Sequence, residues 1–355
     1  MTRGYFLENI EAMQGYVPGE QINDAGVIKL NSNENPYPPS PKVLAAITSA
    51  ADVALRRYPE PASDTLRAAA ARVYGVDIDQ IIAGNGSDEL LSMLMRCFVS
   101  PGDRVAYATP TYSLYDTLVE IQNGAKATVR YADDFSIPTA LARQRAAVTF
   151  LCNPNAPSGT LVSRAAIARL ALSIRGILVV DEAYIDFADN DDASCIPLVR
   201  RHDNVIVLRT FSKSFSLAGL RIGLAFASKE IVAGLMKVKD SYNLNRVSAT
   251  AATAALRDLP WMIRNVRRIQ RSRASLSRAL ERLGFQVYPS QTNFVLARRA
   301  HTDMQRIQRA LKAQRILIRH FDVPGLQDCL RISVGTPAET KSVVDALKAS
   351  LRTGA

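Results

Sequence analysis

The sequence predicts an α/β fold, with a large domain built on a mostly parallel sheet sandwiched by helices and a smaller C-terminal α+β domain. The 355 residues are 48% hydrophobic and 22% charged, a globular composition that suits about two domains. Short apolar runs alternate with helical patterns, and each run ends in a polar segment. Apolar strands that alternate with helices are typical of parallel sheets covered on both faces.

The expected elements follow one another in three parts of the chain. An Asn- and Pro-rich N-terminal arm occupies residues 1–40. The large domain, residues 41–259, is expected to hold helices from Ser87, after Pro110 and from Ser163. Its strands are expected at Ile81–Ala83, Arg104–Ala108, Val148–Cys152, Ile177–Val180 and Val205–Leu208.

The small domain, residues 260–355, is expected to begin with a long helix from Pro260 and to close with a helix after Pro337. Between these helices the sequence predicts strands at Phe285–Tyr288, Asn293–Ala297, Ile316–Arg319 and Leu330–Val334.

Composition argues against several classes of protein. The four cysteines and three histidines show no metal-ligand spacing, so neither a metal site nor a disulfide framework is expected. A reducing cytoplasm fits this cysteine usage. Apolar runs fall short of the ~18 residues that a membrane span needs, and no export signal is visible.

The net charge of +11 raises the question of a nucleic-acid partner. Seven arginines lie between Arg264 and Arg282, yet apolar residues recur among them at helical spacing. These apolar residues are Ile263, Val266, Ile269, Leu276, Leu280 and Leu283. We therefore interpret the arginines as the solvated face of an amphipathic helix and expect no nucleic acid.

Polar segments follow all five strands of the large domain. They begin at Gly84, Thr109, Asn153, Asp181 and Arg209. Ligands of open parallel sheets bind at the carboxyl ends of the strands, so the five segments are expected to meet in one crevice.

Two residues of this crevice indicate a chemistry. Lys213, between two serines, could become a nucleophile if burial removed its proton. Asp181 ends a buried strand and needs a cationic partner. The pair Asp181-Glu182 resembles a Walker B strand, but the sequence holds no G-x-x-x-x-G-K-[ST] phosphate loop, so an ATPase is not expected. A protonated pyridine nitrogen is the better partner.

A phosphate could bind where Gly86-Ser87-Asp88 opens a helix, because the first N–H groups of a helix form an anion site. Ser212 and Arg221 could complete that site. Glu89 stands where a dinucleotide fingerprint needs its third glycine, which argues against NAD.

The run Thr210–Gly223 (TFSKSFSLAGLRIG) resembles the lysine segment of fold-type I pyridoxal-phosphate aminotransferases. Five further motifs, in family order, resemble the histidinol-phosphate aminotransferase family in particular, over residues 7–350. They are Leu30–Pro36, Gly84–Glu89, Asn153–Gly159, Asp181–Tyr184 and Leu330–Thr336.

The resemblance implies pyridoxal 5'-phosphate as cofactor and a role for each matching residue. Lys213 would hold the cofactor covalently and move protons, Asp181 would pair with the ring nitrogen, and Tyr112 would stack on the ring. Asn153 and Tyr184 would bind the ring hydroxyl. The phosphate would be bound by Ser87, Asp88, Thr210, Ser212 and Arg221.

The resemblance also implies substrates and assembly. Arg331, helped by Arg319, would bind anionic substrate groups, and Tyr16 and Asn33 would close over the substrate. Tyr58 would reach the cofactor phosphate of a neighbouring subunit, which requires a homodimer with shared active sites. The expected reaction converts histidinol phosphate and 2-oxoglutarate to imidazole acetol phosphate and glutamate, in histidine biosynthesis. An aromatic amino-acid aminotransferase or a phosphothreonine decarboxylase of the same fold remains the alternative.

Overall fold

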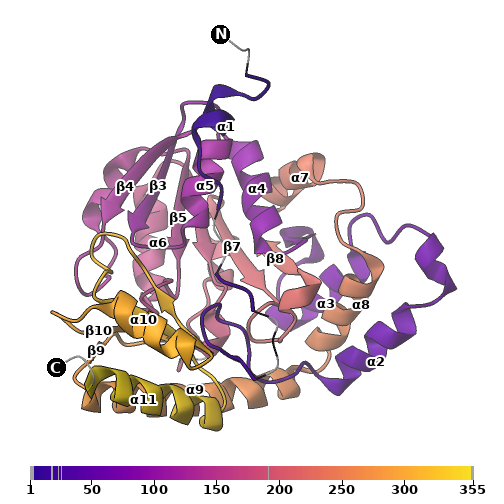
Figure 1. Ribbon diagram of the computed structural model, residues 1–355. Coiled ribbons are helices and arrows are strands. Elements are labelled where there is room, and N and C mark those ends of the chain that lie inside the picture. The colour runs from indigo at the N-terminus through magenta and orange to yellow at the C-terminus, as the bar shows by residue number, and fades with distance from the viewer. Residues whose placement is uncertain (1–3, 17–18, 23, 25, 191, 353–355) are drawn as a thin grey trace.

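A seven-stranded, mostly parallel sheet forms the centre of the computed structural model, which describes residues 4–16, 19–22, 24, 26–190 and 192–352 (Figure 1). Its strand order is β2-β8-β7-β6-β5-β3-β4. The strands are β2 (Ile81–Gly84), β3 (Arg104–Thr109), β4 (Ala125–Arg130), β5 (Val148–Cys152), β6 (Ile177–Asp181), β7 (Val205–Thr210) and β8 (Gly223–Phe226).

The five strands predicted for the large domain are confirmed, and all five point the same way, because β8 runs antiparallel to both β2 and β7. Strands β4 and β8 were missed by the sequence analysis. Strand β4 lies at the sheet edge with a largely exposed pattern, and β8 has four residues only. Strand β8 matters for the site, because its first residue, Gly223, pairs with both Gly84 and Thr210.

Helices cover both faces of this sheet, as predicted (Figure 1). Along β5 the side chains alternate between two separate apolar cores, with Phe150 in one and Leu151 in the other. The helices that follow the arm are α2 (Pro41–Ala50), α3 (Asp64–Tyr74), α4 (Ser87–Phe98), α5 (Leu114–Ile121), α6 (Arg164–Ser173), α7 (Lys229–Val238) and α8 (Arg246–Leu256). The short helix α1 (Glu8–Ala12) lies in the arm and contacts α5.

The C-terminal part holds a four-stranded antiparallel sheet in the order β12-β13-β10-β9. Its strands are β9 (Gln286–Val287), β10 (Phe294–Arg298), β12 (Arg319–His320) and β13 (Cys329–Ser333). The strand predicted at Ile316–Arg319 is instead two strands. Strand β11 (Ile316–Leu317) pairs in parallel with β1 (Ile28–Lys29) of the arm, and β12 pairs with β13.

Three helices pack in this part: α9 (Leu259–Arg282), α10 (Met304–Ala313) and α11 (Pro337–Arg352). No helix among the described residues is long and apolar enough to span a membrane. Residues 1–3 of the predicted arm and 353–355 of the predicted small domain lie outside the described residues.

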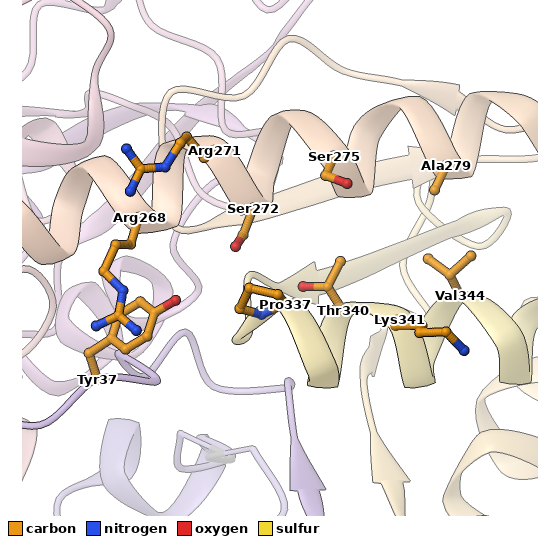
Figure 2. A pocket seen from close by; sticks show the side chains of 10 residues that line it. All are labelled: Tyr37, Arg268, Arg271, Ser272, Ser275, Ala279, Pro337, Thr340, Lys341 and Val344. Carbon is orange, nitrogen blue, oxygen red and sulfur yellow. The ribbon is translucent and has the colours of Figure 1, made fainter.

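The interpretation of the arginine-rich helix holds for most of α9. Four of its predicted apolar residues, Val266, Ile269, Leu276 and Leu280, are buried, although Ile263 is partly exposed. Arg268 and Arg271 are exposed, and Figure 2 shows them beside a hollow of about 430 Å³ between α9 and α11.

Arg273 is the exception on α9, because its side chain is buried. It donates hydrogen bonds to the carbonyls of Phe187 and Thr292 at 2.8 and 2.9 Å and pairs with Asp189 at 2.7 Å. Helical periodicity alone could not separate this arginine from its solvated neighbours.

Candidate active site

A pocket of about 230 Å³ lies at the carboxyl ends of the parallel strands, where the sequence predicted a crevice. Most of the predicted site residues line it together, although they come from segments far apart in the chain. They are Tyr16, Asn33, Ser87, Asp88, Tyr112, Asp181, Tyr184, Thr210, Ser212, Lys213, Arg221, Arg319 and Arg331.

Lys213 follows β7 and extends its amine into this pocket. Its Nζ lies 3.4 Å from the carbonyl oxygen of Ser32 and 5.6 Å from the centre of the Tyr184 ring. Burial, helped by the positive charge of Arg331, lowers the pKa of the Lys213 amine to about 8. A far larger fraction of this amine than of an ordinary lysine is therefore neutral and nucleophilic near neutral pH, and the neutral form becomes dominant above pH 8.

Asp181 is the last residue of β6. Its side chain lines the pocket and is buried from bulk water. The backbone N–H of Ala183 donates to Oδ1 at 3.1 Å, and the hydroxyl of Tyr115 donates to Oδ2 at 3.0 Å. Among the described residues no cation forms an ion pair with Asp181, and burial raises its pKa to about 6. A cationic ligand group would stabilise the ionised carboxylate here.

Tyr184 and Asn33 form a pair in the same pocket. The Asn33 Nδ2 donates to the Tyr184 hydroxyl at 3.0 Å, which leaves the phenol proton free to donate to a ligand. Burial raises the pKa of Tyr184 to about 12, so the phenol stays protonated.

Asn153 does not line the pocket. Its side-chain amide is hydrogen-bonded to the backbone of Val162, accepting from N–H at 2.9 Å and donating to C=O at 3.2 Å. The ring-hydroxyl contact expected for Asn153 stays a prediction, and in this structure its amide already has partners.

The start of α4 and the segment after β7 form a cradle of hydrogen-bond donors. Gly86 precedes α4 with a φ of 85°, and a Cβ there would meet Arg221 at 2.7 Å. A Cβ on Gly223 would lie 2.6 Å from the backbone nitrogen of Ser87. The two glycines thus allow the helix N-terminus and the arginine to face the same space, where a phosphate would fit.

Side chains around that cradle are already linked to one another. Arg221 donates to Ser212 Oγ at 3.3 Å and pairs with Asp88 at 2.9 Å, and Thr210 donates to Ser212 at 3.0 Å. The Tyr112 hydroxyl donates to Asp88 at 3.3 Å, and this bond holds the Tyr112 ring beside the cradle as one wall of the pocket. The Asp88 carboxylate lies in this cradle, but its negative charge is unsuited to an anion. The backbone N–H of Asp88 is the group that could bind one.

A second cationic group lies at the other end of the pocket. Strands β12 and β13 pair Arg319 with Arg331, and both guanidinium groups lie near the ring of Phe321, at 5.6 and 5.4 Å. Arg331 is partly exposed and donates to the Asn31 carbonyl at 2.9 Å, while its buried Nε has no hydrogen-bond partner among the described residues. A guanidinium with an orphan buried donor is suited to an anionic ligand.

Tyr16 and Tyr58 differ in position. Tyr16 lines the pocket, with its ring 6.2 Å from that of Tyr112. Tyr58 lies outside it, 79% exposed, and stacks on Tyr242 with ring centres 4.3 Å apart.

Several lining residues were missed by the sequence analysis. Ser32 and Asn31 contribute backbone carbonyls, and Phe321 contributes a ring between two arginines. Tyr115 lies behind Asp181 and outside the pocket lining. It lies in α5, whereas Tyr112 precedes that helix, so the spacing of the two tyrosines gave no signal that could have indicated it.

Comparison with known proteins agrees with this geometry. The family model for aminotransferase class I and II matches residues 25–347. The chain is 48% identical over 342 residues to histidinol-phosphate aminotransferase of Citrifermentans bemidjiense, covering 96% of this chain and 97% of that relative. It is 45% identical over 350 residues to histidinol-phosphate aminotransferase 1 of Trichormus variabilis, covering 98% and 99%.

Solved structures support the same conclusion. The crystal structure of histidinol-phosphate aminotransferase from Sinorhizobium meliloti in complex with pyridoxal-5'-phosphate matches with a TM-score of 0.91 and 30% identity, covering 100% of this chain and 99% of that one. L-threonine-O-3-phosphate decarboxylase from Porphyromonas gingivalis, at 24% identity and a TM-score of 0.81, shares the fold. The chain therefore belongs to the class I and II aminotransferases, within the histidinol-phosphate aminotransferase family.

Proposed function

We propose that this chain transfers the amino group of L-histidinol phosphate to 2-oxoglutarate, giving imidazole acetol phosphate and L-glutamate, as a step of histidine biosynthesis. Relatives of that name match nearly the whole chain at 45–48% identity. The single structural observation that carries the proposal is Arg331, whose buried Nε lacks a partner among the described residues, in a pocket that also holds the partly buried Lys213. Both the phosphorylated amine and glutamate bring an anion to such a group.

The pocket fits pyridoxal 5'-phosphate as cofactor. When bound, the cofactor supplies an aldehyde for amine exchange and a ring that withdraws electrons from the reacting carbon. Lys213 offers the neutral amine for the covalent link, and Asp181 offers a buried carboxylate for the ring nitrogen. We assign the phosphate to Ser87, Asp88, Thr210, Ser212 and Arg221.

The remaining assignments follow from position. Tyr112 forms the wall on which the ring would stack, and Tyr184 keeps a free proton for the ring hydroxyl, with Asn153 as the predicted second donor. Lys213 Nζ, when its amine is free, would accept a proton from the substrate Cα and hold it until it is delivered to the product. Arg331 and Arg319 bind the substrate anion, and Tyr16 and Asn33 cover it.

We also propose a homodimer in which Tyr58 serves the partner's active site. Tyr58 lies outside the pocket of its own chain and is exposed. Three apolar side chains shortly before it in the sequence are also exposed, Leu44, Val53 and Leu55. Exposed apolar side chains of this kind mark interaction surfaces. Residues 41–259 and 260–355 are proposed as the cofactor-binding and small domains, and a cytoplasmic location fits four unpaired cysteines.

A set of half-reactions tests the substrate. The loaded enzyme is mixed separately with histidinol phosphate, phenylalanine, tyrosine and phosphothreonine, and the loss of the cofactor's visible absorption is followed. Histidinol phosphate is expected to react fastest. A faster reaction with phenylalanine or tyrosine would assign the chain to the aromatic amino acids, and carbon dioxide release from phosphothreonine would indicate a decarboxylase.

A further inference from the structure

Tyr115 lies directly behind Asp181, the carboxylate that we assign to the cofactor's ring nitrogen. It belongs to α5, is fully buried, and donates its hydroxyl hydrogen to Asp181 Oδ2 at 3.0 Å. It does not line the pocket, so it acts on the site only through its neighbours.

The Tyr115 ring is held by aromatic neighbours, among them Phe150 and Tyr112. It stacks on Phe150 with ring centres 4.6 Å apart and planes 11° apart, and the edge of Tyr112 meets it at 5.6 Å. Phe150 itself lies in β5, which pairs with β6, the strand that ends at Asp181. The direction of the O–H bond toward Asp181 is thus fixed by the same packing that fixes the sheet.

We propose that Tyr115 is a positioning residue that orients the Asp181 carboxylate and weakens its basicity, so that the proton between Asp181 and the cofactor's ring nitrogen stays on the ring. The proposal rests on the proposed function, because it assumes that pyridoxal phosphate binds here. With Ala183 N–H on Oδ1 and Tyr115 O–H on Oδ2, each carboxylate oxygen accepts one hydrogen bond from the protein.

Two bases compete for this proton, the Asp181 carboxylate and the ring nitrogen of the cofactor. Burial makes Asp181 more basic than an ordinary carboxyl group, and a hydrogen bond donated to the ionised form has the opposite effect. Without the phenol, the carboxylate would attract the ring proton more strongly. The ring would then carry less positive charge and withdraw electrons less well from the reacting carbon.

The test uses Tyr115→Phe in the cofactor-loaded enzyme, without substrate. Its readout is the pH at which the visible absorption of the bound cofactor changes. A less cationic ring makes the nitrogen that joins it to Lys213 more basic, so the midpoint should rise by about half a pH unit or more. The dissociation constant of pyridoxal phosphate should also rise, by about 3- to 10-fold.

Tyr107→Phe is the matched control. Tyr107 is also fully buried, packs edge to face on Tyr115 at 6.0 Å, and donates its own hydroxyl hydrogen to Asp116, away from the pocket. It should lose thermal stability as Tyr115→Phe does, yet keep the wild-type absorption midpoint.

Two results would overturn different claims. Tyr115→Phe could have the same absorption midpoint and the same dissociation constant for the cofactor as the wild type and Tyr107→Phe. In that case Tyr115 is a packing residue and the positioning role is wrong. If the wild-type chain itself binds no pyridoxal phosphate, the proposed function fails first.

Discussion

At the scale of single residues, the pocket combines a lysine that burial makes less basic with an arginine whose Nε has no hydrogen-bond partner among the described residues. The Arg331 fork can bind two oxygens of one anion, which an ammonium group cannot do. Arg331→Lys should therefore lower kcat/KM for both half-reactions by about 5- to 150-fold, equal to ~1–3 kcal/mol. Arg298→Lys, on β10 and outside the pocket, is the control. An effect on one half-reaction only would show that the two substrates use different anion sites.

The pKa of Lys213 gives a second prediction at this scale. Because the pKa is lowered to about 8, the neutral amine becomes dominant above that pH. The rate at which apoenzyme links covalently to added pyridoxal phosphate should rise with pH, with its midpoint near pH 8, and level off about one pH unit higher. The same reaction of Nα-acetyl-lysine, measured in parallel, corrects for the aldehyde.

Arg331→Gln should move this midpoint upward, since it removes a cation that lowers the pKa of Lys213. A wild-type midpoint near 10 would show that the amine stays hydrated.

The sequence predicted the residues at strand ends better than those on other elements. Lys213 and Asp181 could be placed together because parallel strands end at one edge of the sheet. The pairing of Arg319 with Arg331 depends on the β12–β13 register, which a sequence pattern cannot define. Tyr115 was missed because a buried tyrosine on a helix has the pattern of any core residue.

At the scale of elements, α9 shows what periodicity can and cannot predict. Its apolar stripe predicted the buried face, yet Arg273 is buried among the polar positions and binds two carbonyl groups and Asp189. Arg273→Met should lower the free energy of unfolding by about 2–4 kcal/mol, because the buried carbonyls lose their donor.

Arg271→Met, two residues earlier and exposed, should change the free energy of unfolding by less than about 0.5 kcal/mol. Denaturant unfolding of both variants checks the difference. Equal midpoints would mean that water replaces the guanidinium without cost.

At the scale of the whole molecule, the position of Tyr58 bears on the proposed homodimer. Tyr58 is exposed and stacks on Tyr242 outside its own pocket, so the proposed contact with a cofactor would be made across an interface. Lys213→Ala chains and Tyr58→Phe chains should therefore complement each other after subunit exchange. In each mixed dimer, the chain that keeps Lys213 receives Tyr58 from its partner, so one site is whole.

Random exchange of equal amounts makes roughly a quarter of all sites whole, so the mixture should regain roughly that share of wild-type activity. If Tyr58 acted within its own chain, both sites of the mixed dimer would lack one group. A mixture no more active than the mean of its two parent dimers, although size measurements show that subunits have exchanged, would contradict the shared site. Tyr5→Phe, an exposed tyrosine of the arm, replaces Tyr58→Phe in the control mixture and should give about half the wild-type activity, because the half of the chains that keep Lys213 also have Tyr58 available.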